Sequence, residues 1–220
     1  MTAFYRPLAA GSLAIAAIAA LSGCSSKGDI VVDEGVGITA IRSRCPAVGI
    51  PEYTGDITLF RTPVAQTADA IDVVAAMTNV RSTCNDAGDK VQSTVSFDVL
   101  ARRSDTRGAR QVTLPYFVTV LRGGTAVITK RIGSVTVSFA DGQDRAQAHG
   151  SGSSAIDRDA ATLPADISKR ITRKRKAGDS DAALDPLADP QIRAAVTSAT
   201  FELLTGFQLD DKQIAYNATR

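Results

Sequence analysis

The residue types that carry most catalytic chemistry are scarce in this sequence. Its 220 residues include one histidine and three cysteines. The histidine, His149, lies in a stretch rich in glycine and serine, with Asp144, Ser151 and Asp157 close to it along the chain. A catalytic triad requires side chains held rigidly within hydrogen-bond distance, and this stretch has no nucleophile elbow to hold them. We therefore predict no catalytic residue here and no enzymatic activity.

The aspartates near the C-terminal third are the nearest approach to a metal-binding pattern. They are spaced somewhat like the ligands of a calcium loop: Asp179, Asp181, Asp185 and Asp189. The segment lacks the mid-loop glycine and the terminal glutamate of an EF-hand, so we interpret these residues as turn formers and helix caps. One imidazole also falls short of the three or four ligands of a zinc site. The sequence therefore predicts neither a metal nor a cofactor.

A dense basic run is the one candidate for a specific surface interaction. It holds six cations within eight residues: Lys169, Arg170, Arg173, Lys174, Arg175 and Lys176. In one interpretation the run is a solvated strand or tail that Asp179, Asp181 and Asp185 neutralise. In the other it binds an anionic partner, either lipid headgroups or the acidic face of another protein. The net charge of +2 argues against nucleic acid as the main partner.

The N-terminus resembles the signal segment of a bacterial lipoprotein. Arg6 precedes an apolar run from Leu8 to Leu21, which has the length of a secretory h-region and is too short to span a membrane. The run ends at Leu21-Ser22-Gly23-Cys24, which is similar to a lipobox. The resemblance implies cleavage before Cys24, which then carries fatty acyl chains such as palmitate and holds the protein to a membrane.

The chain as a whole resembles small envelope lipoproteins of Gram-negative bacteria, a group without a common assigned function. Ser25 follows the cysteine in place of aspartate, which by this resemblance favours the outer membrane, with the protein facing the periplasm. The alternative is the periplasmic side of the inner membrane. The implied organisation is a signal peptide at 1–23, a lipidated tether at 24–37, a β-rich domain at 38–180 and a C-terminal helical segment at 181–220.

Two cysteines remain after Cys24, and export would place them in an oxidising compartment. An even pair in such a compartment favours a disulfide between Cys45 and Cys84. The alternative is two free buried thiols.

Alternation of apolar and polar residues predicts a mainly β domain. The clearest strand covers 90–102, preceded by a run at 70–84 that fits a strand or a helix. A second hairpin is expected from 111–122 and 125–139 around Gly123-Gly124, with Val120 opposite Val127 and an edge or bulge at Pro115. Residues 140–163 suggest an exposed loop or a frayed strand pair. We predict an antiparallel β-sandwich of immunoglobulin-like architecture with a C-terminal α-helix; the alternative is a small β-barrel plus helix.

The C-terminal segment predicts helices packed on this domain. Asp189 is an expected N-cap before Pro190, and the helix is expected to continue to Thr205 and to stop at Gly206. Asp210 is expected to cap a second, shorter helix that returns Ile214 and Tyr216 to the domain.

These patterns favour a non-enzymatic, lipid-anchored binding or scaffolding module of the periplasm. One alternative is an accessory subunit of an envelope assembly or export machine that docks through the helix at 190–205. Another is a hydrolase of the cell wall or of lipid, which a pocket of converging carboxylates would favour.

The lipobox generates a direct prediction. Replacing Cys24→Ala should leave an uncleaved or soluble protein, because the thioether cannot form, whereas the wild type should fractionate with membranes. Cell fractionation and mass spectrometry of the N-terminus check this. Wild-type protein found soluble with an unmodified N-terminus would contradict it.

Overall fold

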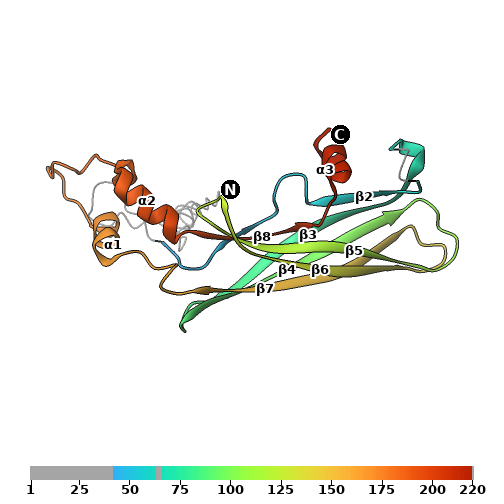
Figure 1. Ribbon diagram of the computed structural model, residues 1–220, viewed down its shortest axis with the longest axis horizontal. Helices are drawn as coiled ribbons and strands as arrows, with labels where there is room; N and C mark the ends of the chain where they lie inside the picture. Colours follow the sequence, from blue (N-terminus) through green and yellow to red (C-terminus); the bar gives the residue numbers. More distant parts are fainter. Residues whose placement is uncertain (1–41, 63–65, 220) are drawn as a thin grey trace, which may run out of the picture.

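The computed structural model describes residues 42–62 and 66–219, and these form two packed four-stranded sheets. The first sheet has the order β1, β8, β5, β6, and the second the order β2, β3, β4, β7 (Figure 1). The first sheet's strands are β1 (Ala47–Gly49), β8 (Phe201–Phe207), β5 (Arg110–Arg122) and β6 (Ala126–Phe139). The second sheet's strands are β2 (Asp56–Phe60), β3 (Ile71–Asn85), β4 (Lys90–Arg103) and β7 (Arg145–Asp157).

Every neighbouring pair of strands is antiparallel except β1 with β8. The predicted class, a mainly β sandwich with a C-terminal helix, is confirmed. Short 3-10 helices occur at Ala68–Ala70 (η1) and Pro186–Ala188 (η2). Helices α1 (Ala165–Thr172) and α2 (Pro190–Ala199) lie beyond one end of the sandwich, and α3 (Asp211–Thr219) lies beside β2 (Figure 1).

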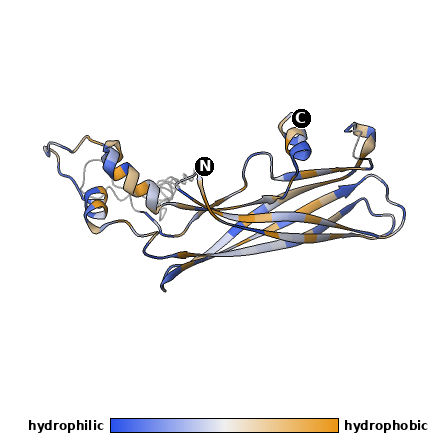
Figure 2. Ribbon diagram, viewed as in Figure 1, coloured by the Kyte–Doolittle hydropathy of each residue, from blue (hydrophilic) through white to orange (hydrophobic). Residues whose placement is uncertain are grey.

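The core lies between the sheets and follows the alternation in the sequence. On β4, Val91, Val95, Phe97 and Val99 are all buried, as the pattern predicted. Val99 belongs to one cluster with Leu114 of β5 and Val137 of β6, so both sheets contribute to it. Figure 2 shows the same alternation of apolar and polar residues along the long strands.

The ambiguous run at 70–84 is the strand β3, which pairs with both β2 and β4. Its register shifts between Thr78 and Arg81, and Asn79 there has a φ of 52°. Asparagine tolerates this left-handed conformation better than most residues. The strand is therefore irregular at Asn79, and this irregularity breaks the strict alternation that would have identified the run as a strand. Cys84 near the end of β3 is bonded to Cys45, which confirms the predicted disulfide.

The hairpin from β5 to β6 forms, but its predicted register is wrong. Arg122 pairs with Ala126 and Leu121 with Val127, so the turn contains Thr125 in addition to Gly123 and Gly124. Both glycines have positive φ. The register of the two strands then shifts between Val120 and Leu121, so Val120 pairs with Thr129. A three-residue loop with a nearby irregularity is a common alternative to the two-residue turn.

Pro115 lies as expected at an edge, at the end of the stretch of β5 that has only one neighbouring strand. The partner strand β8 pairs with β5 only from Tyr116 onward, so before Pro115 β5 has a neighbour on one side alone. An edge position suits proline because it has no backbone N–H to donate.

The segment 140–163, expected to be an exposed loop or a frayed strand pair, is not a loop over most of its length: residues 145–157 form the regular strand β7 along β4. Its inward positions include Gly150 and Gly152. A Cβ on Gly150 would collide with the Phe97 ring, and one on Gly152 would collide with Val118. These glycines therefore make room for large side chains of neighbouring strands and do not mark a flexible loop.

The expected helix at 190–205 is also too long. The Asp189 side chain caps α2 by accepting hydrogen bonds from the backbone N–H groups of Gln191 and Ile192, as predicted. The helix ends at Ala199, and β8 follows as an inner strand of the first sheet. Phe201, Leu203 and Phe207 face inward from β8 and are buried. Their spacing of two and four residues fits the period of a strand and not that of a helix.

The last helix, α3, forms as predicted. Asp210 accepts a hydrogen bond from the Gln213 N–H, and the Gln213 side chain accepts one from Asp210 in return, which is a capping box. Tyr216 packs edge-on against Phe60 with ring centroids 5.1 Å apart, as predicted, whereas Ile214 is 39% exposed.

The disulfide should contribute strongly to stability because its two cysteines are 39 positions apart in the sequence. Chain-entropy arguments for a loop of this length give about 4 kcal/mol. We expect the double variant Cys45→Ser with Cys84→Ser to lower the free energy of unfolding by up to that amount, measured by denaturant titration. Two alkylatable thiols in wild-type protein purified without reductant would contradict the prediction.

Candidate binding site

The basic run does not form the strand considered above. Lys169 and Arg170 belong to α1, and the remaining cations follow the helix. Ile171 of α1 is buried and packs in a helical cluster with Ile167, Ile192 and Val196. This cluster joins α1 to α2 and uses the apolar faces of both helices.

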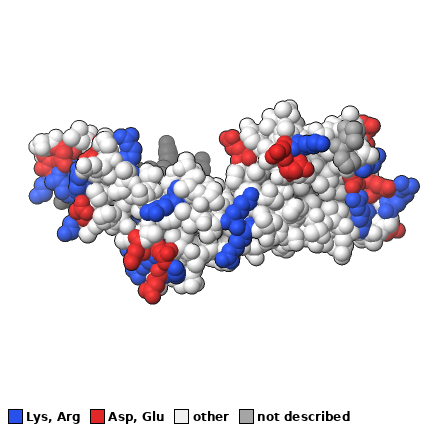
Figure 3. Space-filling model, viewed as in Figure 1, with Lys and Arg blue, Asp and Glu red and all other residues white. Residues whose placement is uncertain are grey.

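Aspartates pair with the three arginines of the run. This agrees in part with the interpretation that Asp179, Asp181 and Asp185 neutralise it, since Asp181 is one partner and Asp189 is the other. Arg170 is 2.6 Å from Asp189, and Asp181 pairs with both Arg173, at 2.5 Å, and Arg175, at 3.4 Å. The hydrogen bond from Arg173 holds the pKa of the Asp181 carboxyl below its usual range. Figure 3 shows charges of both signs gathered at the end of the molecule that carries α1 and α2.

The other aspartates of this segment have structural roles. Asp179 accepts a hydrogen bond from the Lys176 N–H, and Asp185 accepts one from the Leu187 N–H. Together with the cap at Asp189, these contacts account for the calcium-like spacing. Over residues 42–62 and 66–219, no group of three or more His, Cys, Asp or Glu side chains is placed to hold a metal ion.

The structure does not assemble the triad considered around His149. His149 and Asp157 lie eight positions apart on the same strand, which separates them by roughly 26 Å. Asp157 pairs instead with Lys90, and His149 lies against Asp98 on β4, with Nδ1 2.6 Å from Oδ1. A hydrogen bond from Asn79 lowers the pKa of Asp98, and His149 lowers it further. The pair lies on the exposed outer face of the second sheet.

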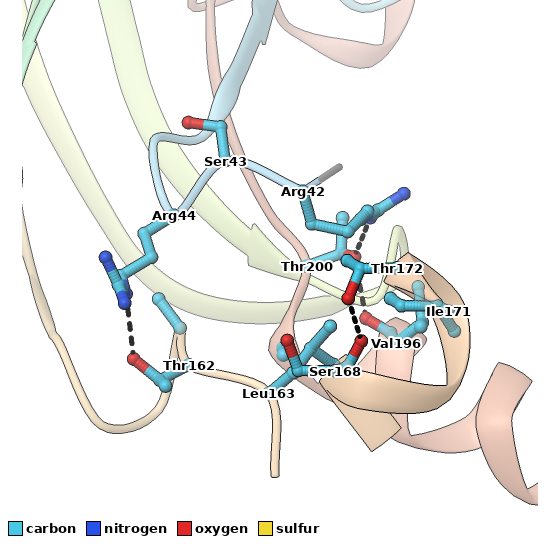
Figure 4. A pocket seen from close by; sticks show the side chains of 12 residues that line it. Arg42, Ser43, Arg44, Thr162, Leu163, Ser168, Ile171, Thr172, Val196 and Thr200 are labelled. Atoms are coloured by element: carbon cyan, nitrogen blue, oxygen red, sulfur yellow. Dashed lines mark hydrogen bonds between the residues drawn. The ribbon is translucent and has the colours of Figure 1, made fainter. Parts of the chain in front are cut away.

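A small pocket lies at the end of the sandwich where the described chain begins. Its volume is about 240 Å³. Its walls come from residues 42–44, the segment after β7, the helix α1 and the end of α2 (Figure 4). Leu163, Ile171 and Val196 provide apolar surface, and the other lining residues include two arginines and several hydroxyl side chains.

Arg42 and Arg44 extend toward different sides of this pocket (Figure 4). Arg42 donates to the Thr200 hydroxyl at 2.5 Å, and Arg44 donates to the Thr162 hydroxyl at 3.1 Å. Arg44 also reaches Asp86 at 3.3 Å, next to the disulfide. Arg42 forms no ion pair with a described carboxylate. The pocket is therefore positively charged on the Arg42 side.

The threonine hydroxyls of the pocket already use their protons. Thr162 donates to the Arg158 carbonyl, Thr172 to Ser168 and Thr200 to Val196. A guanidinium has five N–H groups, and Arg42 makes one hydrogen bond within the described chain. The free donors of the pocket are therefore mainly N–H groups of the arginines, which suits a ligand rich in acceptor oxygens.

Sequence reasoning missed this pocket because no linear motif defines it. Its residues come from four segments that only the fold brings together. One sequence feature could have indicated it. Arg42 and Arg44 lie directly before Cys45, and the disulfide of Cys45 holds this part of the chain, with its two cations, close to the domain.

Comparisons with known proteins add no identification: no family model, no curated protein and no solved structure matches this chain. None of the described helices has the length and apolar character needed to cross a membrane.

The ion pairs of Asp181 generate a pH prediction. Because its folded pKa is lowered, its stabilising effect is complete above its ordinary pKa of 3.8 and is lost as the pH falls through the folded value. Asp181→Asn should therefore lower the melting temperature at neutral pH, and this difference should shrink on acidification below pH 3.8. Asp159→Asn, a change at an exposed turn, is the control. An Asp181→Asn effect that does not depend on pH would contradict the argument.

Proposed function

We propose that this protein is a lipid-anchored envelope protein whose β-sandwich is a non-enzymatic binding module facing the periplasm. The proposed anchor, Cys24, and the proposed tether before residue 38 lie outside the described residues. The observation that carries the proposal is the arginine-lined pocket at the end where the described chain begins. On this proposal the tether leads from that end to the membrane.

The ligand that suits the pocket is a small anionic group such as the phosphate of a lipid headgroup. Guanidinium groups donate parallel hydrogen bonds to phosphate oxygens, and they match this geometry better than lysine does. The pocket is smaller than the roughly 300–1,000 Å³ of sites for drug-sized ligands, so a headgroup fragment suits it better than a large molecule. A tethered protein would also meet membrane phosphates at high local concentration.

The pocket supports binding better than hydrolysis. None of its twelve lining residues is a carboxylate, a cysteine or a histidine. The alternative role, an assembly subunit, was expected to dock through a helix at 190–205. That helix, α2, ends at Ala199, and its apolar residues Ile192 and Val196 are buried within the protein, which disfavours docking through this face. A protein-binding role therefore requires a different surface.

The pocket can be tested with an unanchored chain that begins at Ser25. We expect Arg42→Gln to weaken its binding to vesicles containing phosphatidylglycerol about tenfold, because the one pocket cation without an ion pair is lost. Arg193→Gln, which removes an exposed cation from α2, should have little effect. Cosedimentation at increasing salt measures both.

Inorganic phosphate added as a competitor separates a phosphate site from general attraction to a charged surface. Competition by phosphate at constant ionic strength is expected for wild type and not for Arg42→Gln. Equal binding by wild type, Arg42→Gln and Arg193→Gln would overturn the assignment of this pocket.

A further inference from the structure

The first half of β6 is exposed to an unusual degree for an apolar strand. All seven residues from Ala126 to Ile132 are exposed, including Val127 at 63%, Ile128 at 51% and Ile132 at 57%. β6 is the last strand of its sheet, so its outer edge has no hydrogen-bonded neighbour among the described residues. An open edge with large apolar side chains is a template for another strand.

The other half of β6 is closed by β7 of the opposite sheet. Tyr116 passes close to Gly133, where an added Cβ would lie 2.6 Å from the Tyr116 Cζ atom. Its hydroxyl then donates to the Ser151 carbonyl of β7 at 2.7 Å. Before Gly133 the sheets separate and leave a cleft of about 230 Å³ that Ile128 and Ile156 help to line. The opening is thus confined to 126–132.

Two cations lie within this open stretch and have no carboxylate partner among the described residues. Lys130 lies over the Phe117 ring, with Nζ 4.9 Å from its centroid, and Arg131 is adjacent. The arginines of the basic run, by contrast, are paired with aspartates. Charge complementarity therefore selects an acidic occupant for β6.

We propose that residues 126–132 of β6 bind an extended acidic segment of another protein by strand addition. Backbone hydrogen bonds to the free edge would provide affinity, and apolar side chains of the added strand would contact the exposed aliphatic residues. Carboxylates on that strand would pair with Lys130 and Arg131. A second copy of this chain suits the edge poorly, because two β6 strands side by side would bring like charges together.

This inference goes beyond the proposed lipid headgroup site and uses none of its residues. Failure at the Arg42 pocket therefore leaves the β6 surface untouched, and failure at β6 leaves the pocket untouched.

The test uses the full processed chain in detergent and a synthetic peptide of valines around a pair of adjacent glutamates, because Lys130 and Arg131 are consecutive in β6 and point to opposite faces. We expect peptide binding, measured by fluorescence anisotropy, to weaken at least tenfold in the double variant Lys130→Glu with Arg131→Glu. The matched control is Arg193→Glu with Lys212→Glu, two exposed cations on α2 and α3. Bound peptide should also slow hydrogen exchange at amides of residues 126–132.

Several outcomes would overturn the proposal. They are no peptide binding, equal binding by both double variants, and slowed exchange confined to other strands. Protection of β6 that appears without peptide and disappears on dilution would assign the edge to a second copy. Protection that appears only in nanodiscs of anionic lipid would assign it to a membrane surface.

Discussion

A single buried arginine organises the end of the sandwich opposite the helices. Arg103 is 2% exposed, and its guanidinium donates to the carbonyls of Thr106, Gly108, Ala140 and Gln143. The first two belong to the connection from β4 to β5 and the last two to the connection from β6 to β7. Both connections cross between the sheets. The buried charge is stable there because its N–H groups are hydrogen-bonded and its guanidinium carbon lies 5.2 Å from the centroid of the Phe139 ring. Arg103 thus joins both connections, together with the hydrogen bonds from the Gly142 N–H to the Thr106 carbonyl and from the Gly108 N–H to the Asp141 carboxylate.

The opposite end is held by different means and is correspondingly more open. There the disulfide joins Cys45 to the end of β3, and Arg44 adds an ion pair to Asp86 in the following turn. The connection from β7 to β8 contains α1 and α2, and its own buried arginine, Arg175, pairs with Asp181 of the same connection. The helices pack on each other through their own apolar cluster. This looser construction creates the arginine pocket and leaves the first half of β6 uncovered.

The long strands and the disulfide could be predicted because they depend on local patterns. Alternation along β4 and the paired cysteines are visible without knowledge of the fold. The strand β7 could not be recognised in the same way, because its inward residues are small only to accommodate Phe97 and Val118 of other strands. The strand β8 was not recognised because the apolar residues after Ala199 also fit the spacing of a helix. Pairing with β5 makes this segment a strand. The pocket could not be predicted because its lining residues come from four segments that only the folded structure brings together.

Neutralisation explains why the most conspicuous charges in the sequence are not the best candidates for binding. A cation that already has a carboxylate partner gains little from a second anion, since the new contact must replace an existing one. Arg170, Arg173 and Arg175 are in this position. Arg42, Lys130 and Arg131 attract no attention by density in the sequence, yet each lacks an ion pair within the described chain and borders a cleft or an open strand edge. On both proposals, binding depends on cations that have no ion pair in the described part of the folded chain, and the sequence does not show which cations these are, because it does not show which aspartates pair with which arginines.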